Sequence, residues 1–204
     1  MTLAICPLTP EVVHQVARMA TVPSDERSFD NFLAGLGWRY AGGFDDSYQT
    51  AAGQVVWSTH YAASGRPDQV VWAAFCVYDP EYDDEQNADY LAEVWGGPDG
   101  WTLRREEGRA AFDLAWDSAA EMVGGILGPP AVTAVEREAV GDDREEEFRM
   151  AVWRNGDSVL ALAQDADPVC YSNFVSDFLV AVRYPADRPL PPAADLTEWY
   201  QGLQ

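Results

Sequence analysis

Closely spaced carboxylates are the groups in this sequence with the clearest chemical potential. The stretch from Asp79 to Glu93 holds seven acidic residues in fifteen positions and no basic residue. Tyrosines and a tryptophan lie within or just after this stretch, and both residue types are enriched where proteins bind one another. We therefore predict that it forms a partner-binding surface. The predicted members of that surface are Asp79, Glu81, Tyr82, Asp83, Asp84, Glu85, Asp89, Tyr90 and Trp95.

A calcium loop is a second chemistry to consider, because acidic or amide side chains alternate from Asp79 to Asn87. An EF-hand loop needs Gly at its sixth position and Glu at its twelfth. The residues at those positions are Asp84 and Tyr90. We therefore expect no metal site in this stretch.

A second acidic run extends from Asp142 to Glu147, with one arginine and no aromatic residue inside it. Its carboxylates repel one another, which predicts an extended and hydrated linker between two strands. A secondary role in an acidic face is also open to it.

Nucleophilic catalysis finds little support in the spacing of the reactive residues. His14 falls on the polar side of a predicted helix, and His60 lies two residues from Ser58 on a predicted strand. Side chains at that strand spacing are about 7 Å apart, which is too far for a nucleophile to bond directly to its base. The chain has no lysine, and this excludes lysine Schiff bases and P-loops. We expect a non-catalytic protein that uses no cofactor.

The chain has 34 acidic and 13 basic residues and a net charge of −21, and this charge limits the possible partners further. Nucleic acids and anionic membranes both attract clustered cations, so we expect neither as a partner. Complementary charge favours a basic protein instead. The three cysteines lack the spacing of a disulfide framework or a zinc site, and the N-terminus lacks signal-peptide features. A cytoplasmic location is the resulting expectation.

Apolar periodicity predicts the elements that must position these groups. A helix is expected after the capping residue Thr9, a second over 29–36 with Gly37 at its end, and a long one from Arg109 to Leu127 that Gly128 ends. Strands are expected over 38–41, 54–61 and 69–78, followed by 101–103 and 131–135. The strand at 69–78 is apolar on both faces, which is typical of a central strand.

The C-terminal part predicts a hairpin and then helices. Asn155-Gly156 joins two strand-like runs at 148–154 and 157–164, which is a strong hairpin signal. Apolar residues at helical spacing predict a helix over 172–183. Four prolines in 185–194 predict a semi-rigid linker, and Asp195 is expected to cap a short final helix.

These elements predict an α+β fold with a mostly antiparallel sheet, in the order α-α-β-β-β-acidic excursion-α-β-β-β-α-α. The helices at 109–127 and 172–183 are expected to cover one face of that sheet. Residues 1–184 are predicted to form one domain, followed by the linker and short helix at 185–204.

Two sequence features and the composition carry a resemblance to known proteins. They are the helix stop Leu127-Gly128-Pro129-Pro130, the Phe32-Leu33-x-x-Leu36-Gly37-Trp38 segment, and an acidic, alanine-rich, lysine-free chain. Together they resemble a group of uncharacterised actinobacterial proteins, some of which accompany polymorphic toxins and are thought to act as immunity proteins. The element order also resembles the small α+β chaperones of bacterial secretion.

The sequence therefore favours a non-catalytic acidic protein that inhibits a basic toxin or effector, as the resemblance to immunity proteins implies. A chaperone-like homodimer is one alternative. The other is an enzyme or small-ligand domain with a pocket between the sheet and the helices, using His60 and Ser58.

Overall fold

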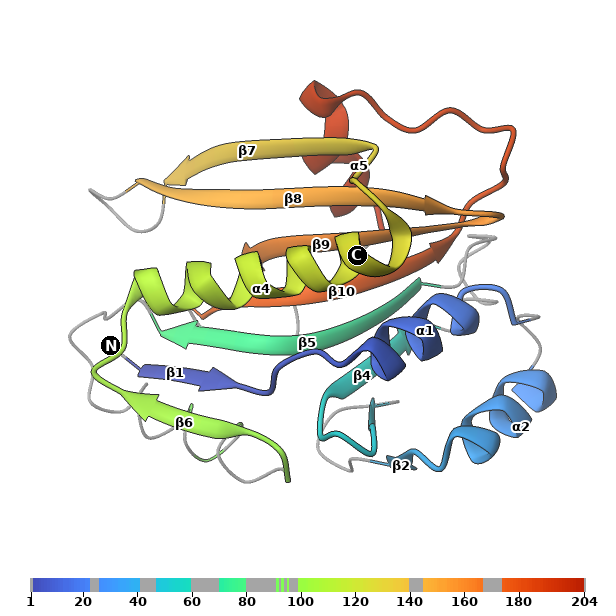
Figure 1. Ribbon diagram of the computed structural model, residues 1–204, viewed down its shortest axis with the longest axis horizontal. Coiled ribbons are helices and arrows are strands. Elements are labelled where there is room, and N and C mark those ends of the chain that lie inside the picture. Colours follow the sequence, from blue (N-terminus) through green and yellow to red (C-terminus); the bar gives the residue numbers. More distant parts are fainter. Residues whose placement is uncertain are drawn as a thin grey trace.

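The fold is α+β, with one large antiparallel sheet and helices against it (Figure 1). The computed structural model describes residues 2–22, 26–40, 47–59, 70–79, 91, 93, 95, 99–139, 145–166 and 174–203. The strands are β1 (Thr2–Ile5), β2 (Arg39–Tyr40), β3 (Ser47–Gln49), β4 (Val55–Thr59), β5 (Val70–Asp79), β6 (Thr102–Arg105), β7 (Val132–Ala139), β8 (Glu145–Asn155), β9 (Ser158–Ala166) and β10 (Val175–Arg183). The helices are α1 (Pro10–Met19), α2 (Glu26–Leu36), α4 (Arg109–Leu127) and α5 (Leu196–Gln201), with a 3-10 turn at Ala193–Asp195.

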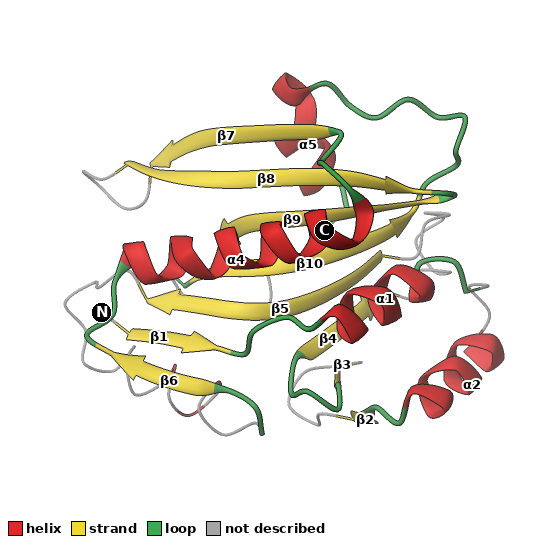
Figure 2. Cartoon of the chain, viewed as in Figure 1, coloured by secondary structure: helices red, strands yellow, loops and turns green. Residues whose placement is uncertain are grey.

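The sheet has the order β2-β3-β4-β5-β10-β9-β8-β7, and every described strand pair is antiparallel. One edge of the long strand β5 is shared end to end by two strands, because β4 pairs with 70–74 and β1 pairs with 76–79. Strand β6 then pairs with the free edge of β1. The predicted fold class is confirmed, and Figure 2 shows how strands dominate the molecule.

The expected helix over 172–183 is wrong, because residues 175–183 form β10 between β5 and β9. Its side chains from Val175 to Val182 are buried. A strand that is apolar on both faces contains residues at helical spacing by chance, so periodicity alone cannot separate the two structures. The β-branched residues Val175, Val180 and Val182 favour the strand.

Both faces of the sheet carry a core. On one face, α1, α4 and part of α2 pack on residues such as Phe75, Leu162 and Leu179. On the other face, Trp95, Trp101 and the C-terminal residues Leu196 and Tyr200 pack on β4, β5, β9 and β10. The C-terminal helix is therefore buried in the same cluster as the sheet's second face.

The structure confirms several predictions that were based on local sequence signals. Helix α1 starts where the Thr9 side chain accepts a hydrogen bond from the Val12 backbone N–H. Helix α4 has the predicted limits and ends at Gly128, whose φ is 86°. In the β8–β9 hairpin, Asn155 pairs with Ser158 across a tight turn in which Gly156 has φ 61°. Strands β1 and β3 were not expected from the sequence.

Two glycines fix the chain that returns from the acidic stretch. A Cβ atom at Gly53 would lie 2.2 Å from the carbonyl oxygen of Asp99, and one at Gly100 would lie 2.4 Å from that of Ala52. Next to this contact the Trp101 indole donates a hydrogen bond of 2.9 Å to the Gly53 carbonyl. Only glycine fits such close backbone approach, so this contact positions the segment that leads into β6 and α4.

Candidate functional site: the acidic end of the sheet and a polar cluster under α4

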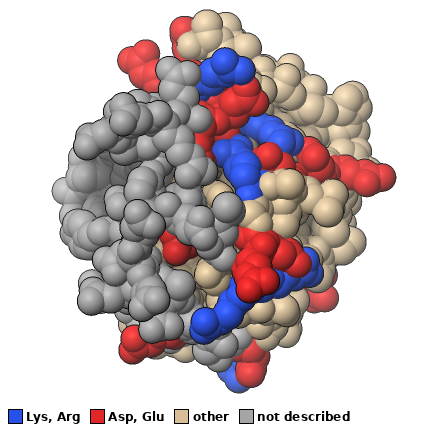
Figure 3. All heavy atoms as spheres, turned by 90° about the vertical axis from the view of Figure 1, so that its left-hand side faces the viewer, with Lys and Arg blue, Asp and Glu red and all other residues tan. Residues whose placement is uncertain are grey.

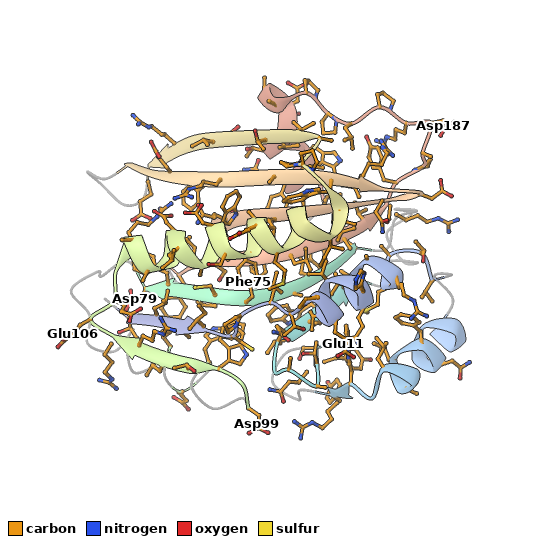
Figure 4. The ribbon with its side chains drawn as sticks, viewed as in Figure 1. Glu11, Phe75, Asp79, Asp99, Glu106 and Asp187 are labelled. Atoms are coloured by element: carbon orange, nitrogen blue, oxygen red, sulfur yellow. The ribbon has the colours of Figure 1, made fainter. Side chains whose placement is uncertain are left out.

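The antiparallel topology brings Asp79, where the first acidic run begins, and Glu145–Glu147, where the second ends, to one end of the sheet. Strand β5 ends there at Asp79, β7 ends there at Ala139, and β8 begins there at Glu145. Residue pairs across the intervening strands, Tyr78 with Val175 and Val175 with Ala166, connect these ends in space. We call this region the acidic end. In Figure 4, Asp79 and Glu106 lie together at this end, and Asp187 lies at the opposite end.

Two predicted surface residues are not on the surface. Asp79 is buried as the last residue of β5, opposite Thr2 of β1. Trp95 is 1% exposed, and its ring lies 4.6 Å from that of Trp101 and 5.9 Å from that of Trp57. The expectation that these two residues contact a partner is therefore wrong, because the second face of the sheet needs large rings to cover it. The other predicted members lie outside the described residues: Glu81, Tyr82, Asp83, Asp84, Glu85, Asp89 and Tyr90.

The second acidic run is partly a strand rather than a hydrated linker. Glu145, Glu146 and Glu147 begin β8. Glu146 is buried, and Glu147 forms a 2.6 Å ion pair with Arg137 on the neighbouring strand β7. These carboxylates are held by arginines, which removes the repulsion that the linker prediction assumed. The rest of this run lies outside the described residues.

Arginines and carboxylates alternate on the described surface of the acidic end. Figure 3 views the molecule from this side and shows both signs close together. Besides Arg137 with Glu147, Arg104 pairs with Glu107 at 3.2 Å. Arg104 and Arg137 are thus paired with neighbouring carboxylates, whereas Arg105 at the end of β6 is exposed and has no ion pair among the described residues. The segments 80–90 and 140–144, which continue from β5 and β7, carry seven acidic residues and one basic residue, Arg144.

Beneath the start of α4 lies a cluster of charged and amide side chains, which we call the polar cluster. Its members come from four elements: Arg109, Asp113 and Asp117 on α4, Glu146 and Arg149 on β8, Gln164 on β9 and Asp177 on β10. Figure 1 shows α4 crossing in front of β9 and β10, the strands that carry Gln164 and Asp177.

Arg109 binds three elements at once. Its guanidinium lies 2.9 Å from Asp113 one helical turn on, 3.0 Å from Glu146 and 3.3 Å from the amide oxygen of Gln164. It also donates a hydrogen bond to the carbonyl oxygen of Glu147. Helix α4 begins at Gly108 without a side-chain cap, so these bonds are what attach its first turn to β8 and β9.

Arg149 attaches the next turn of α4. It lies 3.1 Å from Asp113 and 2.7 Å from Asp117, and its guanidinium stacks 5.4 Å above the Trp116 ring. Asp113 is thus shared by both arginines. Multiple bonds to one carboxylate hold planar guanidinium groups in defined orientations.

Asp177 differs from the other members because its charge has no partner. Its side chain is 0% exposed, and neither carboxyl oxygen has a hydrogen-bond partner among the described residues. Its cross-strand neighbours are Cys76 on β5 and Gln164 on β9. The amide nitrogen of Gln164 is directed to Asp113 instead, at 3.4 Å.

Burial strongly favours the protonated form of this carboxyl group. Desolvation raises the pKa of Asp177 well above the ordinary value, and the nearby negative charge of Asp113 raises it further. The Gln164 amide and the guanidinium groups of Arg109 and Arg149 act in the opposite direction without reversing the shift. An ionised carboxylate without hydrogen bonds is among the most costly groups to bury.

A shallow groove lies between β7–β9 and α5. Its lining includes Glu136, Phe148, Met150, Asp165 and Tyr200. It contains two carboxylates, but none of the residues that line it is a histidine or cysteine. It therefore offers no nucleophile paired with an imidazole base.

The residues considered for catalysis are not brought together by the described structure. Ser58 is buried in β4, His14 is exposed on α1, and His60 lies outside the described residues. Within the described ranges there is no group of three residues able to ligate a metal, and no helix there is long and apolar enough to span a bilayer.

Sequence reasoning missed the polar cluster, although the chain contains a signal for it. Asp177, with Ser176 before it, interrupts an apolar run from Phe174 to Val182. Charged residues are rarely found fully inside a protein without partners, so one in such a run marks a position of interest. The spacing of Arg109, Asp113 and Asp117 at four-residue intervals on α4 is the second signal.

A scan of protein-family models and searches of curated proteins and of solved structures found no match to this chain.

Proposed function

We propose that this protein is a non-catalytic binding protein that docks on a basic protein through its acidic end. A toxin or secreted effector is the kind of partner that this charge favours, as it would for an immunity protein. Complementary charge accelerates association and sets specificity, while buried contacts supply most of the affinity.

The observation that supports this proposal is the convergence of the two acidic runs. They are about fifty residues apart in sequence, yet the points at which they join β5, β7 and β8 lie at the same end of the sheet. The segments that leave Asp79 and Ala139 carry seven carboxylates before the chain next meets an arginine or a described residue: Glu81, Asp83, Asp84, Glu85, Asp89, Asp142 and Asp143. Charge gathered from separate segments produces a stronger local field than the same charge spread over the surface.

The burial of Trp95 changes how such a partner would be held. With this ring in the core, the aromatic anchors that remain for the surface are Tyr82 and Tyr90. Tyrosine is well suited to this role, since it combines a large contact area with a polar tip.

Charge-neutral substitutions in the first acidic run test the proposal. The triple variant Asp83→Asn, Asp84→Asn, Glu85→Gln removes three negative charges from the acidic end. The binding partner for this test is the basic protein that the wild-type chain retains from host extract at low ionic strength. We expect the association rate of the triple variant with that protein to fall at least tenfold, because electrostatic steering depends on local charge. Stopped-flow or surface-based kinetics at two salt concentrations would measure the effect.

A matched control removes three negative charges elsewhere. Glu11→Gln, Glu121→Gln and Asp187→Asn are exposed positions away from the acidic end. The control triple is expected to keep at least half of the wild-type association rate. Equal losses in the two triples would show that only net charge matters, and an unaffected first triple would exclude this surface.

A further inference from the structure

We propose that Asp177 is a proton-controlled catch that holds the first two turns of α4 against the sheet, next to the start of β8. This inference is independent of the proposed function, because it concerns how α4 is held rather than what the acidic end binds.

Asp177 lies on an inner strand of the sheet, on the face that α4 covers. Val175, Leu179 and Ala181 point to the same side of β10 as Asp177, because side chains alternate along a strand, and they belong to the core beneath α1 and α4. The pairing of β10 with β5 shifts by one residue directly after it, so that Asp177 pairs with Cys76 and Phe178 pairs with Ala74.

Polar groups face the Asp177 carboxyl from each neighbouring element. A neutral thiol faces it from β5, an amide from β9, a cation and an anion from α4, and a cation from β8. These are Cys76, Gln164, Arg109, Asp113 and Arg149. The Cys76 thiol is itself kept neutral, since burial raises its pKa.

An ionised Asp177 would compete with the other carboxylates of the polar cluster for Arg109 and Arg149. In the described arrangement these arginines bind Asp113, Asp117 and Glu146, and neither of them forms an ion pair with Asp177. That arrangement suits a protonated Asp177. An ionised Asp177 would need either water or the same guanidinium groups, and both require the start of α4 to lift from the sheet or its ion pairs to rearrange.

The sign of the pH effect follows from this competition. An opened state exposes Asp177, whose pKa then returns to about 3.9, whereas the closed state retains the proton to higher pH. Opening therefore releases one proton. Between the exposed and buried pKa values, each pH unit raises the opening equilibrium about tenfold, and the catch is strongest at low pH within that range.

Hydrogen exchange resolved along α4 tests the catch in the intact chain. We expect protection of the amides over 113–118, relative to those over 122–127, to fall by up to tenfold per unit between pH 5 and 8. In Asp177→Asn, which has nearly the same shape as the protonated acid, the ratio should not vary with pH. Asp187→Asn, at an exposed site, should behave like the wild type.

Two results would overturn the inference. One is a protection ratio with the same pH dependence in the wild type and in Asp177→Asn. The other is the absence, from infrared spectra of the wild-type protein recorded from pH 5 upward, of the carbonyl band of a carboxylic acid that loses its proton above the ordinary carboxyl range. The second measurement needs no variant, so it decides the matter even if Asp177→Asn does not fold.

Discussion

Replacing Trp95 by alanine is expected to destabilise the protein by about 3–5 kcal/mol, the usual range for removing a large buried ring. Trp95 is fully enclosed among Trp57, Trp101 and the second face of the sheet. A domain of this size has only about 5–15 kcal/mol of stability, so this single change removes a large part of it. Urea unfolding followed by circular dichroism would measure the loss.

Leu114→Ala is the comparison for this variant. Leu114 is 65% exposed on α4, and a surface substitution of this kind changes stability by about 0.5 kcal/mol or less. A Trp95→Ala effect as small as that of Leu114→Ala would mean that the indole is accessible in solution. It would then return Trp95 to the list of possible partner contacts.

Replacing Arg109 by alanine has a similarly large expected effect, of about 3–5 kcal/mol, because it leaves buried carboxylates without their cation. The side chain of Glu146 is only 4% exposed, and Arg109 is its ion-pair partner at 3.0 Å. The first turn of α4 also loses its bond to the carbonyl of Glu147. Thermal and urea unfolding should both report this loss.

Two variants separate the buried ion pair from a general effect of lost positive charge. Arg104→Ala breaks an exposed pair whose side chains are 45% and 41% accessible, and it should cost at most about 1 kcal/mol. The double variant Arg109→Met, Glu146→Gln should cost less than the sum of its single changes, by about 0.5–3 kcal/mol. Strict additivity in this double variant would contradict a direct interaction between the two side chains.

Local signals predicted the elements that depend on local structure. Thr9, Gly128 and the Asn155-Gly156 turn each have one dominant conformational preference, so α1, the end of α4 and the β8–β9 hairpin followed from the sequence. These residues act through their own backbone or their immediate neighbours. Tertiary contacts are not needed to recognise them.

The elements and residues that sequence reasoning missed depend on distant contacts. Residues 175–183 form a strand because β5 and β9 flank them, and their apolar pattern alone is equally compatible with a helix. Trp95 is buried because the face of the sheet that α1 and α4 leave free has to be covered. The polar cluster joins residues from 109 to 177, and no local spacing describes such a combination.

The position of β10 also has a consequence for how the chain is completed during synthesis. The final strand of the sheet lies between β5, made early, and β9, made shortly before it. Until residue 183 has left the ribosome, β5 and β9 each present an apolar strand with unpaired amide and carbonyl groups, which is the kind of surface that nucleates misassembly. The two parts of the nascent sheet can join only after β10 has been made, so chains interrupted before β10 should require chaperone protection even though the strands on both sides of it are already present.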